Sequence, residues 1–176
     1  KRAGVTDIIS LSAVGSLKEE YMPGNFVLVD QFIDRTVSRE KTFFGEGCVA
    51  HVSFSHPISD RLQHALHNTC LDLGLPSHLG GTYICMEGPQ FSTLAESNLY
   101  RSWGCDVIGM TNMPEAKLAR EAELPYATVA MVTDYDCWHP DHEAVSVESV
   151  IKVIEKNRDN ANLLLKNALP KIKVRP

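Results

Sequence analysis

The sequence has no long hydrophobic run and no pair of cysteines at metal-binding spacing. No stretch reaches the roughly eighteen apolar residues of a membrane-spanning helix, and the chain does not open with a basic segment followed by an apolar one, as a secretory signal does. The five cysteines are widely spaced and odd in number, which argues against a disulfide framework or a structural zinc site. We therefore expect a soluble, cytoplasmic protein with reduced thiols and no bound metal.

The sequence also lacks an excess of positive charge. It has 17 Lys and Arg residues against 22 Asp and Glu residues, which gives a net charge of −5 at pH 7. The basic residues are scattered along the chain, and this argues against a general nucleic-acid-binding protein. An anionic ligand would need a local pocket lined by amide or basic groups.

Length and composition fit one globular domain over residues 1–176. The chain is 44% hydrophobic and 22% charged, and no internal repeat or linker divides it. Short apolar runs predict buried strands, and apolar residues at spacings of three and four predict helices. The strands are expected at residues 5–11, 26–33, 82–86, 107–110 and 126–132, and the helices at 58–73, 93–103 and 146–168. This alternation predicts an α/β fold with a mixed, largely parallel central sheet flanked by helices.

Residues 36–56 fit neither pattern. They mix glycine, serine, histidine and aromatic residues, as functional loops often do. His51 lies in this irregular segment, and its position alone is compatible with a surface residue or with a substrate contact.

Two carboxylates follow the apolar run that ends at residue 132. Asp134 and Asp136 are separated by Tyr135, and on an extended chain residues two apart point to the same side. Such a pair can share a proton or accept hydrogen bonds from a flat heterocycle. Because ligand crevices in open α/β sheets lie beyond the ends of strands, this pair is the first candidate for a binding site, and a purine edge fits it.

Other polar residues fall at similar places. Residues 10–16 form either an ordinary Ser/Gly turn or an anion-binding turn that includes Ser12. Phe91 and Ser92 are either a hydrophobic staple and a helix cap or contacts to a base. Met110 is either core filler or, with Thr111, part of a ligand wall. The convergence of these residues on strand ends and helix starts favours one shared site.

The segment at 137–142 contains Cys137, His139 and His142. Zinc sites usually combine two ligand clusters, and this segment has no matching second one. We interpret it as a solvated loop, so no metal ligand is assigned.

Five segments together resemble the 5'-methylthioadenosine phosphorylase family, which belongs to the trimeric purine nucleoside phosphorylase class. They are Ser-Ala-Val-Gly-Ser-Leu at 12–17, Gln-Phe-Ile-Asp-Arg-Thr at 31–36, Glu-Gly-Pro-Gln-Phe-Ser at 87–92, Met-Thr at 110–111 and Thr-Asp-Tyr-Asp-Cys-Trp at 133–138. The resemblance covers essentially the whole chain, with the segments in family order. It implies phosphate-dependent cleavage of methylthioadenosine to adenine and 5-methylthioribose 1-phosphate, with inorganic phosphate as co-substrate and no cofactor.

The resemblance also implies residue roles. Ser12, the backbone at Ala13 and Thr111 would hold phosphate, while Asp134 would give a proton or hydrogen bond to the imidazole ring of the leaving adenine. Asp136 would accept a hydrogen bond from the amino group of adenine. The remaining substrate contacts would come from Phe91, Ser92, Met110, Tyr135, Val147, Val150 and Ile151, and from His51 of a neighbouring subunit in a homotrimer.

Ser92 and Val147 would set substrate choice. In relatives that cleave 6-oxopurine nucleosides, glutamate stands in place of Ser92 and asparagine in place of Asp134, so the adenine pattern is present here. A 6-oxopurine nucleoside phosphorylase and a non-catalytic purine-binding fragment are the alternatives. The chain opens at Lys1 without a methionine, and the family's glycine-rich phosphate loop and Arg-His pair are missing. We therefore expect the C-terminal portion of a longer phosphorylase domain, whose N-terminal segment is supplied either as a separate piece or as a preceding stretch of the same chain.

Overall fold

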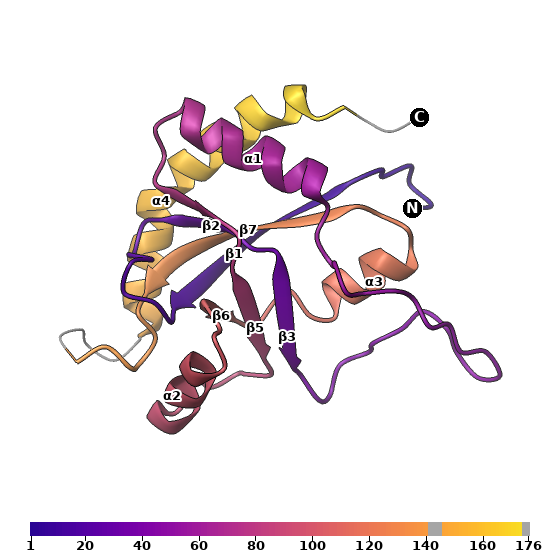
Figure 1. The fold of residues 1–176 in the computed structure, drawn as a ribbon, viewed down its shortest axis with the longest axis horizontal. Coiled ribbons are helices and arrows are strands. Elements are labelled where there is room, and N and C mark those ends of the chain that lie inside the picture. Colours follow the sequence, from indigo (N-terminus) through magenta and orange to yellow (C-terminus); the bar gives the residue numbers. More distant parts are fainter. Residues whose placement is uncertain (141–145, 174–176) are drawn as a thin grey trace.

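The computed structural model describes residues 1–140 and 146–173. Within them, seven strands form one sheet in the order β3-β5-β6-β1-β7-β2-β4 (Figure 1). The strands are β1 (Ile8–Ser16), β2 (Phe26–Leu28), β3 (Gln31–Arg35), β4 (Ser77–Leu79), β5 (Thr82–Met86), β6 (Val107–Gly109) and β7 (Tyr126–Asp134). The helices are α1 (Asp60–Asp72), α2 (Leu94–Ser102), α3 (Glu115–Glu121) and α4 (Val147–Ala168), and α4 continues into a short 3₁₀ helix, η1 (Leu169–Lys171).

The sheet is mixed and mostly parallel, as predicted. The pairs β1–β7, β2–β4, β3–β5 and β5–β6 are parallel, whereas β1–β6 and β2–β7 are antiparallel. The β1–β6 junction is short, because it pairs only Gly15 with Ile108 and Ser16 with Val107. Beyond these two pairs the strands diverge, which leaves room for a cavity at this junction.

One predicted strand proved to be two. Residues 26–33 divide into β2 and β3, which lie in different parts of the sheet. The break falls at Val29 and Asp30, where the Asp30 N–H donates to the Gly81 carbonyl and the Gly80 N–H donates to the Leu28 carbonyl. The chain therefore steps from β2, near one end of the strand order, to β3 at the other end, and it does so through the exposed Asp30.

The first strand also differs from its prediction. Strand β1 runs through Ser16 rather than ending at residue 11, so residues 12–16 are not a turn. Ser12, Val14 and Ser16 are buried while Ala13 and Gly15 between them are half-buried, which is the period of two of a strand. Small hydroxyl residues are accommodated here because β1 pairs with β7 along its whole length.

The predicted helices are confirmed, with boundaries that their caps explain. Helix α1 ends at Asp72 with Leu73 as its C-cap, and Gly74 follows at φ 66°, the left-handed conformation that glycine favours after a helix. Helix α2 has a complete capping box between Thr93 and Glu96. Helix α4 begins directly after Ser146, whose carbonyl accepts the Val150 N–H. Helix α3 and strand β4 were not predicted, since both are short.

Three of the helices cover two separate hydrophobic clusters. Helices α1 and α4 contact each other and strand β7, and together they cover the main core around Phe26, Leu66 and Val129. Helix α2 lies at the other end, below β5 and β6 in Figure 1, over a second cluster that includes Ile84 and Ile108. None of the helices in the described ranges is long and apolar enough to cross a membrane.

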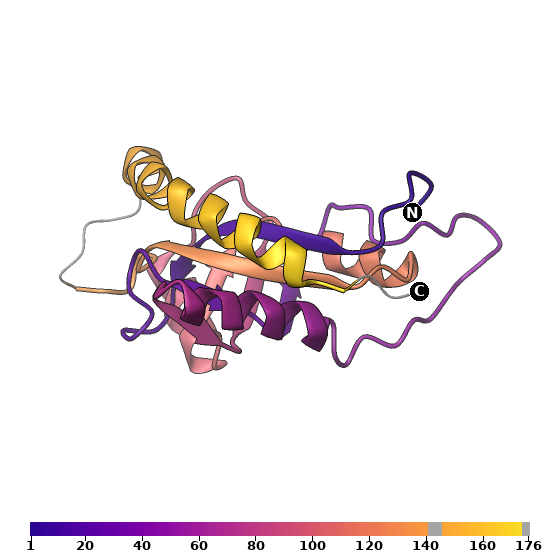
Figure 2. The ribbon, with the colours of Figure 1, turned by 90° about the horizontal axis from the view of Figure 1, so that it is seen from above.

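Residues 36–56 form the irregular excursion that the sequence predicts. They contain no helix or strand, and they extend away from the sheet in both views (Figures 1 and 2). Arg120 of α3 donates hydrogen bonds to the carbonyls of Ser53 and His56. The C-terminal end of the excursion, which includes Ser53 and His56, is thereby tied to α3.

Candidate active site

A cavity lies at the β1–β6 junction, between the end of β7 and the first turns of α4. Most of its wall is apolar, and its polar groups are two carboxylates and two threonines. None of the lining residues, all within the described part of the chain, is a lysine or an arginine. The wall is formed by Ala13, Val14, Gly15, Met86, Phe91, Ile108, Gly109, Met110, Thr111, Thr133, Asp134, Asp136 and Val150.

Gly15 lets the two carboxylates lie against strand β1. The register between β1 and β7 shifts after Val14, which places Gly15 opposite Asp134. A Cβ atom at Gly15 would lie 2.9 Å from Asp134 Oδ1 and 3.3 Å from Asp136 Cβ. Any larger residue would have to push the carboxylates away, so the absence of a side chain at Gly15 is part of the construction of this site.

Asp134 ends β7 and is held at both carboxylate oxygens. Its Oδ1 accepts the Asp136 N–H at 2.7 Å, and its Oδ2 lies 2.7 Å from Thr133 Oγ1. Burial raises the pKa of Asp134 above its ordinary value, and the neighbouring Asp136 carboxylate acts in the same direction. The hydrogen bonds from Thr133 and from the Asp136 amide oppose this rise without cancelling it.

The Thr133 hydroxyl links the protonation of Asp134 to strand β1. Thr133 Oγ1 also lies 3.1 Å from the Val14 carbonyl oxygen, yet a hydroxyl has one proton to donate. If Asp134 is ionised, Thr133 faces two acceptors and can serve only one of them. If Asp134 Oδ2 carries a proton, it donates to Thr133 Oγ1 and the threonine proton goes to Val14. The acid form thus leaves the Thr133 proton for Val14, whereas the bond from Thr133 to the ionised carboxylate lowers the pKa of Asp134; burial is the larger effect and raises it.

Asp136 reaches the cavity by a turn and not by an extended chain. Strand β7 stops at Asp134, and Asp136 has φ 52°, so the expected extended geometry is wrong for this residue. Its buried carboxylate accepts from Ser92, whose Oγ lies 2.7 Å from both carboxylate oxygens. Ser92 does not cap α2, because Thr93 fills that role. The structure thus brings Ser92, Asp134 and Asp136 together.

Three hydroxyl groups cluster around Thr111, which lines the cavity, whereas Ser12 and Tyr83 contact Thr111 without lining it. Ser12 Oγ lies 2.9 Å from Thr111 Oγ1 and 3.1 Å from the Tyr83 hydroxyl oxygen. The Thr111 N–H donates to the Tyr83 oxygen at 3.4 Å. Ser12 and Thr111 were predicted to act together, and they are neighbours although 99 positions separate them in the sequence.

Sequence reasoning missed Tyr83, because a tyrosine within an apolar strand is typical of a core. Its side chain is fully buried, and burial raises the pKa of its hydroxyl, so it is a neutral donor and acceptor. A Cβ atom at Gly109 would overlap the Tyr83 hydroxyl. A glycine at the end of β6 was the only sequence signal for such a close approach.

The other predicted contacts divide into two groups. Ala13, Met110 and Val150 line the cavity, and Phe91 stands at its edge with 41% of its surface exposed. Tyr135, Val147, Ile151 and His51 do not line it.

Each residue of the second group has a different location. The Tyr135 hydroxyl donates to the Glu19 carbonyl at 3.0 Å and its ring packs edge-on against Trp138. Val147 and Ile151 are 58% and 48% exposed near the start of α4. His51 is exposed on the irregular excursion. Tyr135 thus packs within this chain, whereas the other three are open to contacts from outside it.

The weak metal hypothesis at 137–142 gains no support from the described residues. Within them no group of three His, Cys, Asp or Glu side chains is placed to hold a metal ion. His139 Nε2 lies 3.8 Å from a Glu19 carboxylate oxygen. His142 falls outside the described residues.

Comparison with known sequences gives a consistent result. The profile of the phosphorylase superfamily matches residues 1–170. S-methyl-5'-thioadenosine phosphorylase from Rhodospirillum rubrum is 66% identical over 176 residues, which are 100% of this chain and 60% of that protein. The enzyme of the same name from Bradyrhizobium diazoefficiens is 66% identical over 165 residues, covering 94% and 57% of the two chains. The chain thus spans about 60% of the length of the curated relatives that it matches.

Solved structures agree with the sequences. A methylthioadenosine phosphorylase from an Antarctic soil metagenomic library matches with a TM-score of 0.90 at 50% identity, over 96% of this chain and 60% of that one. Methylthioadenosine phosphorylase from Schistosoma mansoni, solved in complex with adenine, matches with a TM-score of 0.95 at 33% identity, over 99% and 68% of the two chains. The chain belongs to the phosphorylase superfamily, and these relatives within it are methylthioadenosine phosphorylases.

Proposed function

We propose that this chain supplies two parts of an active site that cleaves 5'-methylthioadenosine with inorganic phosphate. They are the purine end, formed by Ser92, Asp134 and Asp136, and part of the phosphate end, formed by Ser12, Ala13 and Thr111. The observation that carries the proposal is Asp134, a carboxyl group that lines the cavity and whose pKa is raised by burial. The names of the relatives support the same activity.

The chemistry follows from where charge develops. A phosphate oxygen attacks the anomeric carbon of the ribose as the bond from that carbon to the base breaks, and the bonding electrons move onto the adenine ring. Asp134 delivers a proton to the imidazole ring of adenine, so the departing base leaves neutral. Because this interaction grows as the bond breaks, it lowers the barrier more than it strengthens substrate binding.

Asp136 is proposed to recognise adenine by accepting a hydrogen bond from its amino group. Ser92 Oγ lies 2.7 Å from both oxygens of this carboxylate and shares its one proton with them, so we assign Ser92 the task of orienting Asp136. A 6-oxopurine would present a carbonyl to the same carboxylate, and two acceptors facing each other are unfavourable.

The hydroxyl cluster is proposed to bind phosphate. Ser12 and Thr111 would each turn a hydroxyl toward the anion, with help from the backbone at Ala13, which lines the cavity. The lining residues contribute no cation, so we expect the charged phosphate ligands to come from the segment that the longer relatives contain. The reaction as proposed uses phosphate as co-substrate and requires no organic cofactor or metal.

The exposed predicted residues suggest an assembly. Val150 lines the cavity, and the exposed Val147 and Ile151 extend the apolar surface of α4 outward from it. We propose that they hold the methylthio group, that His51 of a neighbouring subunit covers it, and that the enzyme is a homotrimer. A cytoplasmic location belongs to the same proposal, because the five free cysteines would stay reduced there.

The deciding experiment uses the full-length protein. Adenine release from methylthioadenosine should require phosphate, and methylthioadenosine should be cleaved in preference to inosine. Preference for inosine would favour a 6-oxopurine nucleoside phosphorylase. Calorimetric binding of adenine without turnover in excess phosphate would identify a non-catalytic purine-binding protein and refute the proposal.

A further inference from the structure

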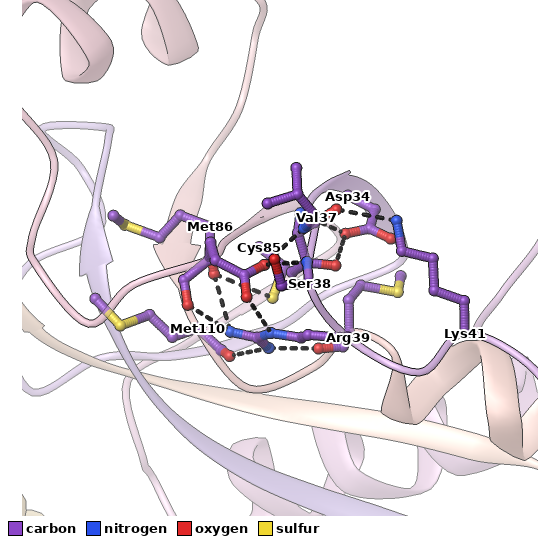
Figure 3. Close-up of polar contacts among 11 residues, drawn as sticks. Asp34, Val37, Ser38, Arg39, Lys41, Cys85, Met86 and Met110 are labelled. Carbon is purple, nitrogen blue, oxygen red and sulfur yellow. Dashed lines mark hydrogen bonds and ion pairs between the residues drawn. The ribbon is translucent and has the colours of Figure 1, made fainter.

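The side chain of Arg39 reaches from the irregular excursion to the back of the cavity wall. Its Nη1 donates to the carbonyls of Met110 at 2.6 Å and Met113 at 2.5 Å. Its Nη2 donates to the carbonyls of Met86 at 3.3 Å and Glu87 at 2.7 Å. Figure 3 shows the guanidinium between these two segments. A single cation thus joins the chain that follows β5 to the chain that follows β6.

The arginine faces a carboxylate as well as the four carbonyls. Its Nε lies 3.7 Å from Glu87 Oε1, and Glu87 Oε2 accepts the Val37 N–H at 2.6 Å. These contacts lower the pKa of Glu87, with the Val37 amide as the largest cause. Arg39 of the excursion therefore donates to the chain after β5, and Glu87 of that chain accepts from the excursion; all four Nη hydrogens of the guanidinium have partners.

The contact with Met110 determines how Thr111 is presented. In a trans peptide the carbonyl and the following N–H point in opposite directions, and the peptide between Met110 and Thr111 is not among the cis bonds. Arg39 holds the Met110 carbonyl of this peptide, while the Thr111 N–H points to the Tyr83 hydroxyl. This peptide is therefore fixed from both sides, and the Thr111 hydroxyl is held 2.9 Å from Ser12 Oγ.

We propose that Arg39 is a positioning residue for the phosphate end of the site, which it sets by fixing the Met110–Thr111 peptide. The inference rests on the proposed function and adds to it a residue that does not line the cavity. Lysine could not replace it, because one ammonium group lacks the planar fork that serves carbonyls on two segments at once.

The test compares Arg39→Ala and Arg39→Lys with the wild-type sequence in the full-length enzyme. Both variants should raise KM for phosphate by about tenfold or more, the size of effect that a small misplacement of a binding group produces. Adenine affinity, measured by calorimetry, should change less than about threefold, because Asp134 and Asp136 are not held by Arg39. Millimolar guanidinium should restore part of the phosphate affinity of Arg39→Ala and none of that of Arg39→Lys, whose side chain fills the position.

Arg120→Gln is the matched control. Arg120 also donates to two carbonyls of the excursion, but it ties them to α3 and not to the cavity wall. Its variant should keep the wild-type KM for phosphate. An unchanged phosphate KM in both Arg39 variants, or an equal loss of adenine and phosphate affinity without guanidinium rescue, would overturn the proposal. Wild-type enzyme that releases no adenine would instead refute the proposed function.

Discussion

At one end of the cavity, two carboxylates and a serine hydroxyl come from two short stretches of chain, Asp134 and Asp136 at the end of β7 and Ser92 before α2. At the other end Thr111 lines the cavity, and Ser12 and Tyr83 contact it without lining the wall; the three residues come from separate parts of the sequence and carry no formal charge. At the first end, burial raises the pKa of Asp134. The second end depends on where neutral hydroxyls are placed, and therefore on contacts to their backbone such as that of Arg39. Changes at the first should act through charge and pH, and changes at the second through geometry.

The largest expected effect is at the purine end. Asp134→Asn keeps the shape of the side chain and removes the proton that the proposed mechanism delivers to the leaving adenine. Phosphate-dependent adenine release by the full-length enzyme should fall by roughly a hundredfold or more, the usual contribution of a general acid. Steady-state kinetics at saturating phosphate measure this, and KM for phosphate should change little. Turnover close to the wild-type value would exclude the role assigned to Asp134.

An intermediate effect is expected at the phosphate end. Thr111→Val replaces the hydroxyl by a methyl group of similar size, and a lost hydrogen bond to a charged ligand costs about 1.5–3 kcal/mol. KM for phosphate should therefore rise by about tenfold to a hundredfold, while adenine affinity stays near its wild-type value. Thr111→Ser keeps the hydroxyl and is the matched control. Equal phosphate KM values for the valine and serine variants would mean that the cluster does not bind phosphate.

The two ends also differed in how well the sequence predicted them. Asp134 and Asp136 were found because they follow a strongly apolar strand, and the period of two suggested their shared side even though Asp136 reaches it by a turn. Ser12 was found, but as part of a turn, because small hydroxyl residues resemble turn formers more than they resemble the strand that pairs with β7.

Arg39 and Tyr83 carry no local pattern that marks their roles. Arg39 lies in a segment without periodicity, and its four acceptors are backbone carbonyls, which every residue provides. Tyr83 differs from a core aromatic only through partners far along the chain. The strand break at Val29 and Asp30 has a similar origin, since it depends on long-range pairing with Gly80 and Gly81, while Asp30 and Gln31 interrupt the apolar run only briefly. Local periodicity thus predicted the elements, and only tertiary contacts complete the phosphate end.

The smallest expected effect again concerns Asp134→Asn. The substitution should lower activity but raise the thermal stability of the protein. Burial raises the pKa of this carboxyl in the folded protein above its ordinary value of 3.8. Below that value both the folded and the unfolded forms are protonated, so the group does not affect stability. As the pH rises, the unfolded form loses its proton first, and stability falls until the folded carboxyl ionises as well. Asparagine cannot ionise, and its amide can donate to Thr133 Oγ1, which frees the threonine proton for the Val14 carbonyl.

Asp134→Asn should therefore unfold at a higher temperature than the wild-type protein at pH 7, by a margin on the order of a few degrees, and the margin should disappear near pH 4 and below. Thermal unfolding of the full-length protein across this pH range measures it. Asp159→Asn, which removes an acid that is 86% exposed on α4, should show no such gain. If the asparagine at position 134 lowers the unfolding temperature at pH 7, the carboxylate is stabilised in its charged form and cannot be the proton donor at the purine end. In the proposed mechanism both effects have one cause, which is that burial raises the pKa of Asp134. The protonated carboxyl can serve as the acid, and its ionisation at higher pH costs stability that asparagine does not lose.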